Sequence, residues 1–521
     1  MPGTLSHLGR LIGIARVLAR HDALFLADLH PSGRSLARVL GAIWRPSPKM
    51  KGLRPGQRLA LALTALGPTF IKFGQALSTR ADLLGDEVTA DLAELQDRLP
   101  PFPFKDVSAT ITADFGKPVA PLFSSIDERP VAAASIAQVH FAVTTEGREV
   151  AVKVLRPQVA EAFARDIALL YWLADMAVRV MPQLARLKPR DVVATFAETV
   201  RLEMDFRFEA AAAQEMAENF ANDPSFKIPS VDWQRTSERV LTLERVAGLR
   251  VDDRAAIAAA GLDPVAVVKT AAEVFFKMVF RHGFFHADMH PGNLFVTAPG
   301  EGEPGGTVIA MDFGIMGRID RATQRTLAEM LLGFITRDYK KVAEVHVNAG
   351  YVPAHKSVDA FAQACRSIAE PILGKPISEI SLARLLGQLF RITETFEMQT
   401  QPQLLLLQKS MLVAEGVGRN LAPETNMWEL AQPMIEGWMR EQLGPEAQVM
   451  TAAESALATL AKVPRIIDRV DAATAEIRSQ GLKLHPDTAR VLRGEDRGAW
   501  SRLWPWAVAA VVILFFLVGR P

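Results

Sequence analysis

Apolar and polar positions change their spacing several times along the chain of 521 residues. Residues 51–123 have a mostly helical pattern, and the proline cluster LPPFPF at 99–104 predicts a turn within it. Short apolar runs over 124–155 predict two or three strands. Long helical patterns follow over about 157–222, and the chain after residue 248 is again mainly helical. This order predicts a small strand-rich part followed by a larger helical part.

The strand pattern separates one lysine from its apolar neighbours. In REVAVKVLRP, Val150, Val152 and Val154 share one face of the predicted strand. Lys153 is left on the opposite face, away from the three valines. The segment TTEG predicts a turn over Thr145–Gly147 before this strand.

A further strand and a hairpin are predicted later in the chain. VLTLERVAG at 240–248 has the strand pattern. LFV at 294–296 and VIAM at 308–311 are joined by TAPGEGEPGGT, whose Gly and Pro residues suit a hairpin loop. HADMHPGN at 286–293 precedes this hairpin and MDFG at 311–314 follows it, so the two polar motifs are expected at its two ends.

Both ends of the sequence have patterns that suggest a membrane. TLSHLGRLIGIARVLARHDALF has apolar residues at helical spacing with Arg10, Arg16 and Arg20 between them, which predicts a basic amphipathic helix. WPWAVAAVVILFFLV at 504–518 has no charge over fifteen residues, about 23 Å as a helix. It predicts a membrane span with arginines before it, although a buried helix is an alternative. The positive-inside rule then places the bulk of the protein, with its catalytic part, in the cytoplasm, or in the matrix of a mitochondrion. Ala- and Arg-rich usage with no obvious presequence favours the bacterial inner membrane over the mitochondrial inner membrane.

Composition excludes only a few classes of binding partner and of site. The formal charge is +1, so no overall field favours nucleic acid. The single cysteine, Cys365, excludes an intramolecular disulfide framework and a zinc site with several cysteines. It lies in a helical pattern and is expected to be a packed core thiol.

The two polar motifs contain the residues that phosphoryl transfer requires. This reaction needs metal ions, a positioned nucleophile and neutralised phosphate charge. Asp312 is placed to bind Mg²⁺ and Asn293 a second metal ion, while Asp288 could accept a proton or orient the attacking group. Lys153 would contact the α- and β-phosphates of ATP. One motif alone would be weak evidence, but their spacing and the strand between them predict a kinase-like site.

Lys153 also needs a carboxylate to hold it. Candidates are Glu203, Asp205 and Glu209 in ETVRLEMDFRFEAAAAQEM. Asp205 and Glu209 share one helical face, but spacing alone does not choose among the three. In addition, AAASIA at 132–137 stands where a kinase has a glycine-rich phosphate loop, and alanine lacks glycine's freedom at positive φ.

In order and content, these motifs resemble the UbiB family of atypical kinases, the ubiquinone-biosynthesis proteins. The marks are KFGQ at 72–75, AAASIAQVH at 132–140, VAVKVLRP, EMDFRFEA, HADMHPGN and DFG. The resemblance implies an α+β, atypical protein-kinase-like fold with two lobes. It also implies a helical N-terminal KxGQ extension and a C-terminal hydrophobic membrane segment.

The resemblance further implies roles for individual residues. The alanine-rich loop would alter nucleotide handling and disfavour self-phosphorylation. Lys72 would cross the cleft toward the site and toward Glu203 and Asp205, and Glu209 would pair with Lys153. The remaining motif residues are Gly74, Gln75, His286 and His290. The other positions implied to bind nucleotide are Ala132, Ala133, Ala134, Ser135, Ile136, Ala137, Val139, Glu244 and Val246.

Some positions depart from this pattern. Ala137 stands where many relatives have Gly, and Gly85 where a Pro is common. No Ala-Pro-Glu element follows the DFG, and His290 takes the place of a lysine found in typical protein kinases. The last two features argue against ordinary protein-kinase activity.

The expected function is that of a membrane-associated atypical kinase or ATPase that binds ATP and Mg²⁺ and supports ubiquinone biosynthesis by handling lipid-soluble quinone precursors. The alternatives are a small-molecule or lipid kinase acting on a hydroxyl, and a nucleotide-binding scaffold. Expected partners are a lipid membrane, ubiquinone precursors and other ubiquinone-biosynthesis proteins, without nucleic acid; homodimerisation is left open. The expected parts are 1–50 (basic N-terminal helices), 51–123 (KxGQ extension), 124–247 (N-lobe), 248–440 (C-lobe), 441–499 (helical tail) and 500–521 (membrane segment).

Overall fold

The computed structural model describes most of the chain up to residue 443. The described residues are 4–25, 39–78, 84–93, 95, 99–180, 188–297, 306–373, 375, 388, 392–393, 395–398 and 402–443. The chain divides into two compact units, Met1–Trp438 and Met439–Pro521. The first unit contains all of the predicted site residues.

An antiparallel sheet of five strands forms the predicted strand-rich part. Along it the order is β1-β3-β4-β6, and β2 pairs with β3. Gly147, at φ 83°, turns the chain between β3 and β4, as the TTEG segment predicts. The strands are β1 (Phe123–Ile126), β2 (Ala132–Ala133), β3 (Ala137–Thr144), β4 (Glu149–Leu155) and β6 (Val240–Glu244).

Helices cover both faces of this sheet. Val150, Val152 and Val154 pack with α7 (Phe104–Phe115) in one core, which confirms the predicted valine face. The other face packs against α8 (Val159–Val180), α9 (Pro189–Glu203) and α10 (Phe206–Asn219). Lys153 therefore lies on the side of the sheet that faces α10.

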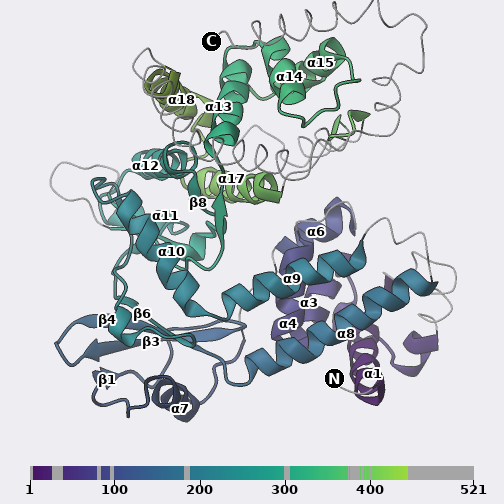
Figure 1. Cartoon of the computed structure of the whole chain (residues 1–521), viewed down its shortest axis with the longest axis vertical. Helices are drawn as coiled ribbons and strands as arrows, with labels where there is room; N and C mark the ends of the chain where they lie inside the picture. Colours follow the sequence, from purple (N-terminus) through teal and green to yellow (C-terminus); the bar gives the residue numbers. More distant parts are fainter. Residues whose placement is uncertain are drawn as a thin grey trace, which may run out of the picture. The chain divides into compact units, whose positions relative to one another are not determined.

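The N-terminal helices form a separate core with α8, next to which Figure 1 shows them. Gly67, at φ 105°, joins two of them directly, because Pro68 begins the next helix in its first position. The elements are α1 (Thr4–Arg20), η2 (Pro48–Met50), α3 (Pro55–Leu66), α4 (Pro68–Leu77) and α6 (Asp86–Ala93). KFGQ lies within α4, so the predicted helical extension is present.

The second part of the kinase-like domain contains two smaller sheets. The predicted hairpin is confirmed, since β9 (Leu294–Val296) pairs antiparallel with β10 (Val308–Ala310). Outside it, β7 (Leu249–Arg250) pairs with β9, and β8 (Phe284–His286) pairs with β11 (Met316–Arg318). Sequence reasoning missed β5 (Phe226–Lys227), which runs parallel to β10 although it precedes β6 in the chain. Two residues give too short an alternation to be recognised.

Helices make up the rest of this part. They are α11 (Arg254–Ala259), α12 (Pro264–Phe276), η5 (Lys277–His282), α13 (Arg321–Ile335), α14 (Tyr339–Asn348), α15 (Val358–Ala369), α17 (Pro402–Leu421) and α18 (Met427–Leu443). Cys365 is buried in the core of α14 and α15, as expected, and burial raises the pKa of its thiol to about 12. That thiol is therefore mainly protonated at neutral pH and unreactive.

Gly283 fixes the entry to β8. It follows the π-helix η5 at φ 62°, and a side chain there would meet the Ile319 carbonyl oxygen 2.5 Å from its Cβ. Both the backbone conformation and the space therefore require glycine. The close packing sets the direction of β8 and of the HADMHPGN motif after it.

Among the described residues, no helix is both long enough and apolar enough to cross a bilayer. The predicted span at 504–518 and the expected tail over 441–499 fall outside the described residues, apart from the last turn of α18.

Candidate active site

Lys153 is the centre of an ion-pair cluster drawn from three elements. From β4, its Nζ donates to Glu209 Oε1 at 2.8 Å and to Oε2 at 3.0 Å. Asp312 Oδ1 lies 3.3 Å from the same nitrogen. Of the three carboxylates that spacing left open, the structure thus brings Glu209 on α10 to Lys153. In protein kinases, an ion pair between a strand lysine and a helix glutamate must be in place for phosphoryl transfer.

Burial and charge act in opposite directions in this cluster. Burial raises the pKa of the Glu209 carboxyl to about 7, although the Lys153 ammonium opposes this. Burial also disfavours the charged form of Lys153, but the Asp312 and Glu209 carboxylates outweigh it and hold the Lys153 pKa above its ordinary value. For Asp312, desolvation favours the neutral acid, yet the Lys153 and Lys72 ammonium groups hold its pKa below the ordinary value. Asp312 is therefore an anion at neutral pH.

His286 joins the two polar motifs. Its ring is fully buried, and burial lowers its pKa, so the imidazole is neutral near pH 7. The ring then has one donor and one acceptor: Nε2–H donates to the Met311 carbonyl at 3.2 Å, and Nδ1 accepts from the Asp288 N–H at 3.1 Å. This histidine is thus a structural link between HADMHPGN and MDFG.

The two predicted metal ligands lie on either side of the hairpin. Asn293 Nδ2 donates to the Asp288 carbonyl at 3.2 Å, so the amide oxygen is the atom that can bind a cation. The Met311 N–H donates to the Asn293 carbonyl at 2.8 Å, which holds the two motifs together at the end of the hairpin. The sequence placed Asp288, Asn293 and Asp312 in one site, and these bonds bring their backbones together.

Asp312 has the features of a metal ligand. Its φ of 62° is left-handed, a conformation that Asp tolerates better than most residues and that often occurs at functional sites. Its side chain is 48% exposed, so the carboxylate can reach a ligand. Within the described residues no group of three or more His, Cys, Asp or Glu forms a metal site. Mg²⁺ needs only one or two protein ligands when phosphates and water supply the rest, so Asp312 and Asn293 fit it.

KFGQ on α4 lies close to this cluster. Lys72 pairs with Glu203 Oε2 at 2.9 Å, with both side chains largely buried, and its charge acts on Asp312. Gly74 fits closely, because a Cβ there would lie 2.6 Å from Leu63. Gln75 is half-buried on the same helix. The implied reach of Lys72 toward the site and Glu203 is therefore seen.

Two predicted motif residues have local structural contacts. Asp205 is the N-cap of α10, where its Oδ1 accepts from the Arg207 N–H at 3.1 Å, and its carboxylate pairs with the Arg207 guanidinium at 2.7 Å. Of the two carboxylates Glu203 and Asp205, Glu203 is the one that forms an ion pair with Lys72, at 2.9 Å. His290 caps the turn Pro291–Asn293 by accepting from the Gly292 N–H at 3.1 Å. That contact shapes the loop and favours a structural role for His290.

The alanine-rich loop is a tight β-hairpin. Ala132 and Ala133 pair with Val139 and Gln138, and the Ala134 N–H donates to the Ala137 carbonyl at 2.7 Å. Between them Ser135 and Ile136 are buried. The alanine-rich segment is therefore a hairpin whose backbone is internally hydrogen-bonded.

The remaining predicted nucleotide-binding residues lie on the five-stranded sheet that carries Lys153, or just after its last strand. Val139 is half-buried and lies directly opposite Lys153 in the β3–β4 register, so both point to the same face. Glu244 ends β6, where it pairs with Lys227 at 2.6 Å, and Val246 follows in the link to β7.

Ser410 is a site residue that sequence reasoning missed. It lies on α17, is completely buried, and its hydroxyl is 3.2 Å from the His286 carbonyl and 3.0 Å from the Leu406 carbonyl. A serine in an apolar helical segment gives no signal of such a contact, since the partner is 124 residues away.

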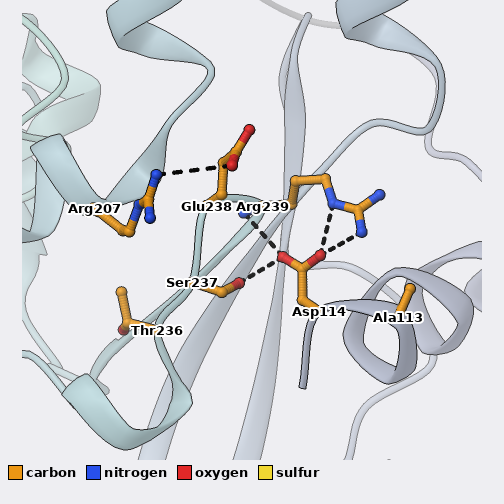
Figure 2. A pocket seen from close by; sticks show the side chains of 7 residues that line it. All are labelled: Ala113, Asp114, Arg207, Thr236, Ser237, Glu238 and Arg239. Carbon is orange, nitrogen blue, oxygen red and sulfur yellow. Dashed lines mark hydrogen bonds and ion pairs between the residues drawn. The ribbon is translucent and has the colours of Figure 1, made fainter. Parts of the chain in front are cut away.

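A polar groove of about 690 Å³ is lined by residues of α7, the start of α10 and the segment before β6. Figure 2 shows the side chains that line it. Its charges neutralise one another: Asp114 accepts from Arg239 Nε at 2.7 Å and from the Ser237 hydroxyl at 2.6 Å, and Arg207 lies 3.7 Å from Glu238. None of its lining residues belongs to the Lys153 cluster, so the chemistry is located by the cluster and not by this groove.

Known families match most of the chain. Residues 94–346 match the family described as ABC1 atypical kinase-like domain, and residues 365–426 match the UbiB helical domain. These matches cover the alanine-rich loop, the Lys153 cluster and α17.

Curated relatives extend the similarity to nearly the full length. A protein of Marinobacter nauticus named "Probable protein kinase UbiB" is 40% identical over 98% of this chain and 93% of its own. Proteins with the same name from Aeromonas hydrophila and Pseudomonas putida are 42% and 43% identical, over 90% and 84% of this chain and 86% and 81% of theirs. The solved structure titled "The complex structure of Rv3197-erythromycin from Mycobacterium tuberculosis" has a TM-score of 0.47 at 23% identity, covering 80% of this chain and 96% of that one.

Proposed function

The chain belongs to the UbiB family of atypical kinases, which implies a role in ubiquinone biosynthesis, and from this premise we propose that it binds ATP with Mg²⁺ and releases phosphate from it. The observation that carries the proposal is the cluster of Lys153, Glu209 and Asp312 beside the HADMHPGN loop. For stability alone, apolar residues would serve as well as or better than a buried lysine held by two carboxylates. The position of this cluster next to a kinase-like loop therefore favours a functional role.

Each residue of the cluster has a defined task in this reaction. Glu209 holds the Lys153 ammonium so that it can neutralise the α- and β-phosphates. Asp312 and Asn293 would hold Mg²⁺, which when bound neutralises charge on the phosphate oxygens. Asp288, set by the His286 ring and by the Asn293 amide, orients the attacking hydroxyl or water. The chain thus supplies position and charge, which is what phosphoryl transfer requires.

The acceptor is proposed to be water or a small molecule. The support is α4, whose Lys72 pairs with Glu203 and lies close enough to Asp312 to lower its pKa. A helix at this position occupies space near the phosphate site that a protein substrate would need. The HADMHPGN loop would also permit transfer to a hydroxyl of a phenolic or lipid compound, and the identity of the product distinguishes the two cases.

We further propose that the reaction serves lipid-soluble quinone precursors at a membrane. The support is the family relationship together with the basic helix α1, whose exposed positions include Ile12, Arg16 and Arg20. These three recur every four residues and so share one helical face. Apolar and basic side chains on one face suit the interface of an anionic bilayer.

The deciding experiment is phosphate release from ATP by the purified full-length protein with Mg²⁺, with and without liposomes and a phenolic quinone-precursor mimic. The Asp312→Asn variant should lower the rate by at least about a hundredfold, because it removes a metal ligand at the charge-bearing centre. Mass spectrometry of the mimic would reveal transfer to a hydroxyl. A rate no higher than that of Asp312→Asn, despite saturable nucleotide binding, would instead support the scaffold alternative.

A further inference from the structure

Arg156 binds three successive carbonyl groups of the alanine-rich loop. It directly follows β4, and its backbone N–H donates to the Ile136 carbonyl at 2.7 Å. Its guanidinium donates from Nη2 to the Ala134 carbonyl at 3.0 Å and from Nε to the Ser135 carbonyl at 3.2 Å. A guanidinium suits this task because its donors form a rigid fork.

These bonds fix the direction of the loop amides. In a planar trans peptide the N–H points opposite to the C=O of the same unit. The N–H groups of Ser135 and Ile136 share peptide planes with the Ala134 and Ser135 carbonyls, so they are turned away from Arg156. Successive N–H groups turned to one side attract anions such as phosphate.

The outer side of Arg156 is anchored to the proline-rich segment 99–104. Arg156 Nη2 donates to the Pro100 carbonyl at 3.1 Å, and the guanidinium lies over the Phe102 ring at 5.2 Å. Gln138 on β3 fixes the same segment, since its amide accepts from the Phe102 N–H at 3.0 Å and donates to the Phe102 carbonyl at 3.2 Å. Arg156 is thus held on both sides, between this segment and the loop.

We propose that Arg156 is a positioning residue that aims the alanine-rich loop amides at the phosphates of a nucleoside di- or triphosphate. A glycine-rich loop can adapt its backbone to phosphates, whereas alanines restrict that freedom, so the direction of the amides must be set by an outside contact. Arg156 provides this contact through its three carbonyl bonds. The inference rests on the proposed binding of ATP and names the residue that shapes the phosphate subsite.

The test compares Arg156→Lys with Arg148→Lys in the full-length protein. Lysine keeps the charge but cannot bond several carbonyls in a fork. Arg148 precedes β4 just as Arg156 follows it, and it pairs with Asp232 at 2.7 Å, so its variant is a matched control at the other end of the strand. Binding of Mg-ADP and of adenosine is measured by calorimetry, and amide exchange of residues 132–138 by mass spectrometry.

Arg156→Lys should speed amide hydrogen exchange in the loop. It should weaken the affinity for Mg-ADP about tenfold, which corresponds to the loss of one or two hydrogen bonds, and leave the affinity for adenosine unchanged. Arg148→Lys should leave all three values at the wild-type level. Phe102→Leu removes only the ring under the guanidinium. It should weaken Mg-ADP binding by a smaller factor, and it provides the test if Arg156→Lys does not fold.

The outcomes separate two failures. A wild-type protein that does not bind Mg-ADP contradicts the proposed function. A wild-type protein that binds it, with Arg156→Lys and Phe102→Leu unchanged in affinity, overturns only the role of Arg156. Equal weakening of adenosine and Mg-ADP also overturns that role, because it would indicate general damage to the sheet.

Discussion

At the scale of single residues, one lysine connects the sequence pattern to the chemistry. Lys153 faces away from the valine core because a strand alternates its side chains, and the free face brings it to Glu209 and Asp312. Burial is the main cause of the raised Glu209 pKa, and the Asp312 carboxylate adds to it, whereas the Lys153 and Lys72 ammonium groups keep Asp312 ionised. An ionised Asp312 has the charge that a metal ligand needs.

Glu209→Gln should lower phosphate release by about a hundredfold, because Lys153 loses the carboxylate that fixes its ammonium. The rate is measured under saturating ATP and Mg²⁺. Glu215→Gln is the matched control, since Glu215 lies on the same helix and pairs with Arg318 away from the cluster. Equal rates for the two variants would show that the ion pair does not serve the reaction.

A buried histidine should make the fold sensitive to acid. His140 donates from Nδ1 to the Asp127 carbonyl at 2.7 Å and accepts at Nε2 from the Gln138 amide at 2.9 Å, and burial lowers its pKa below 6.5. As the pH falls, His140 therefore takes up a proton in the unfolded chain at a higher pH than in the folded chain. Its contribution to the free energy of unfolding is fully present above about pH 6.5 and decreases below that pH.

Protonation of this one group should lower the free energy of unfolding by up to about 1.4 kcal/mol for each pH unit. Urea unfolding at pH 7.5, 6.5 and 5.5 measures it. The His140→Gln variant should lose less stability on acidification than the wild type does, because its side chain does not titrate. Identical slopes for both proteins would rule out His140 as the source.

At the scale of elements, α17 contacts the HADMHPGN segment from outside the residues matched as the atypical kinase-like domain. This helix lies in the segment matched as the UbiB helical domain and reaches β8 through the Ser410 hydroxyl. The His286 carbonyl that Ser410 contacts belongs to the residue that also fixes Asp288 and Met311. A family-specific helix can thus influence the position of catalytic groups.

Ser410→Ala should lower kcat about three- to tenfold and leave the KM for ATP nearly unchanged, because the hydroxyl supports the loop and not the nucleotide face. Steady-state phosphate release measures both constants. Ser367→Ala is the control: Ser367 is exposed on α15 and bonds only the Ala364 carbonyl of its own helix. A change in KM alone would contradict this assignment.

At the scale of the whole molecule, membrane binding is proposed to involve two separate regions. The first is α1, which packs Ile14 into the N-terminal core and exposes Ile12, Arg16 and Arg20 on the other side. The second is the apolar segment 504–518, known here from its sequence. With two membrane-binding regions, the protein would remain at the bilayer when one of them is removed.

Removal of residues 500–521 should therefore reduce sedimentation with vesicles of anionic lipid only in part. Adding Arg16→Glu and Arg20→Glu should release most of the remainder, because each basic residue near such a surface contributes about 1 kcal/mol. The residual binding should also weaken with added salt. Complete release by the truncation alone would show that α1 does not attach the protein.

The sequence by itself determined the elements and the motifs. Alternation and helical spacing are local properties, so they predicted the strands around Lys153, the hairpin between Asn293 and Asp312, and the helical extension with KFGQ. Motif spacing also placed the polar site residues at the two ends of that hairpin. These features depend on residues that are neighbours in the chain.

Only the tertiary structure decided which distant groups meet. It brought Glu209 to Lys153, kept Asp205 as a helix cap, joined Phe226–Lys227 to the second sheet, and placed Arg156 and Ser410 against the loops. Such contacts depend on how helices and sheets pack, and many sequences with the same local periodicity could pack differently. Periodicity therefore fixes which face of an element is buried, whereas packing selects the partner on that face.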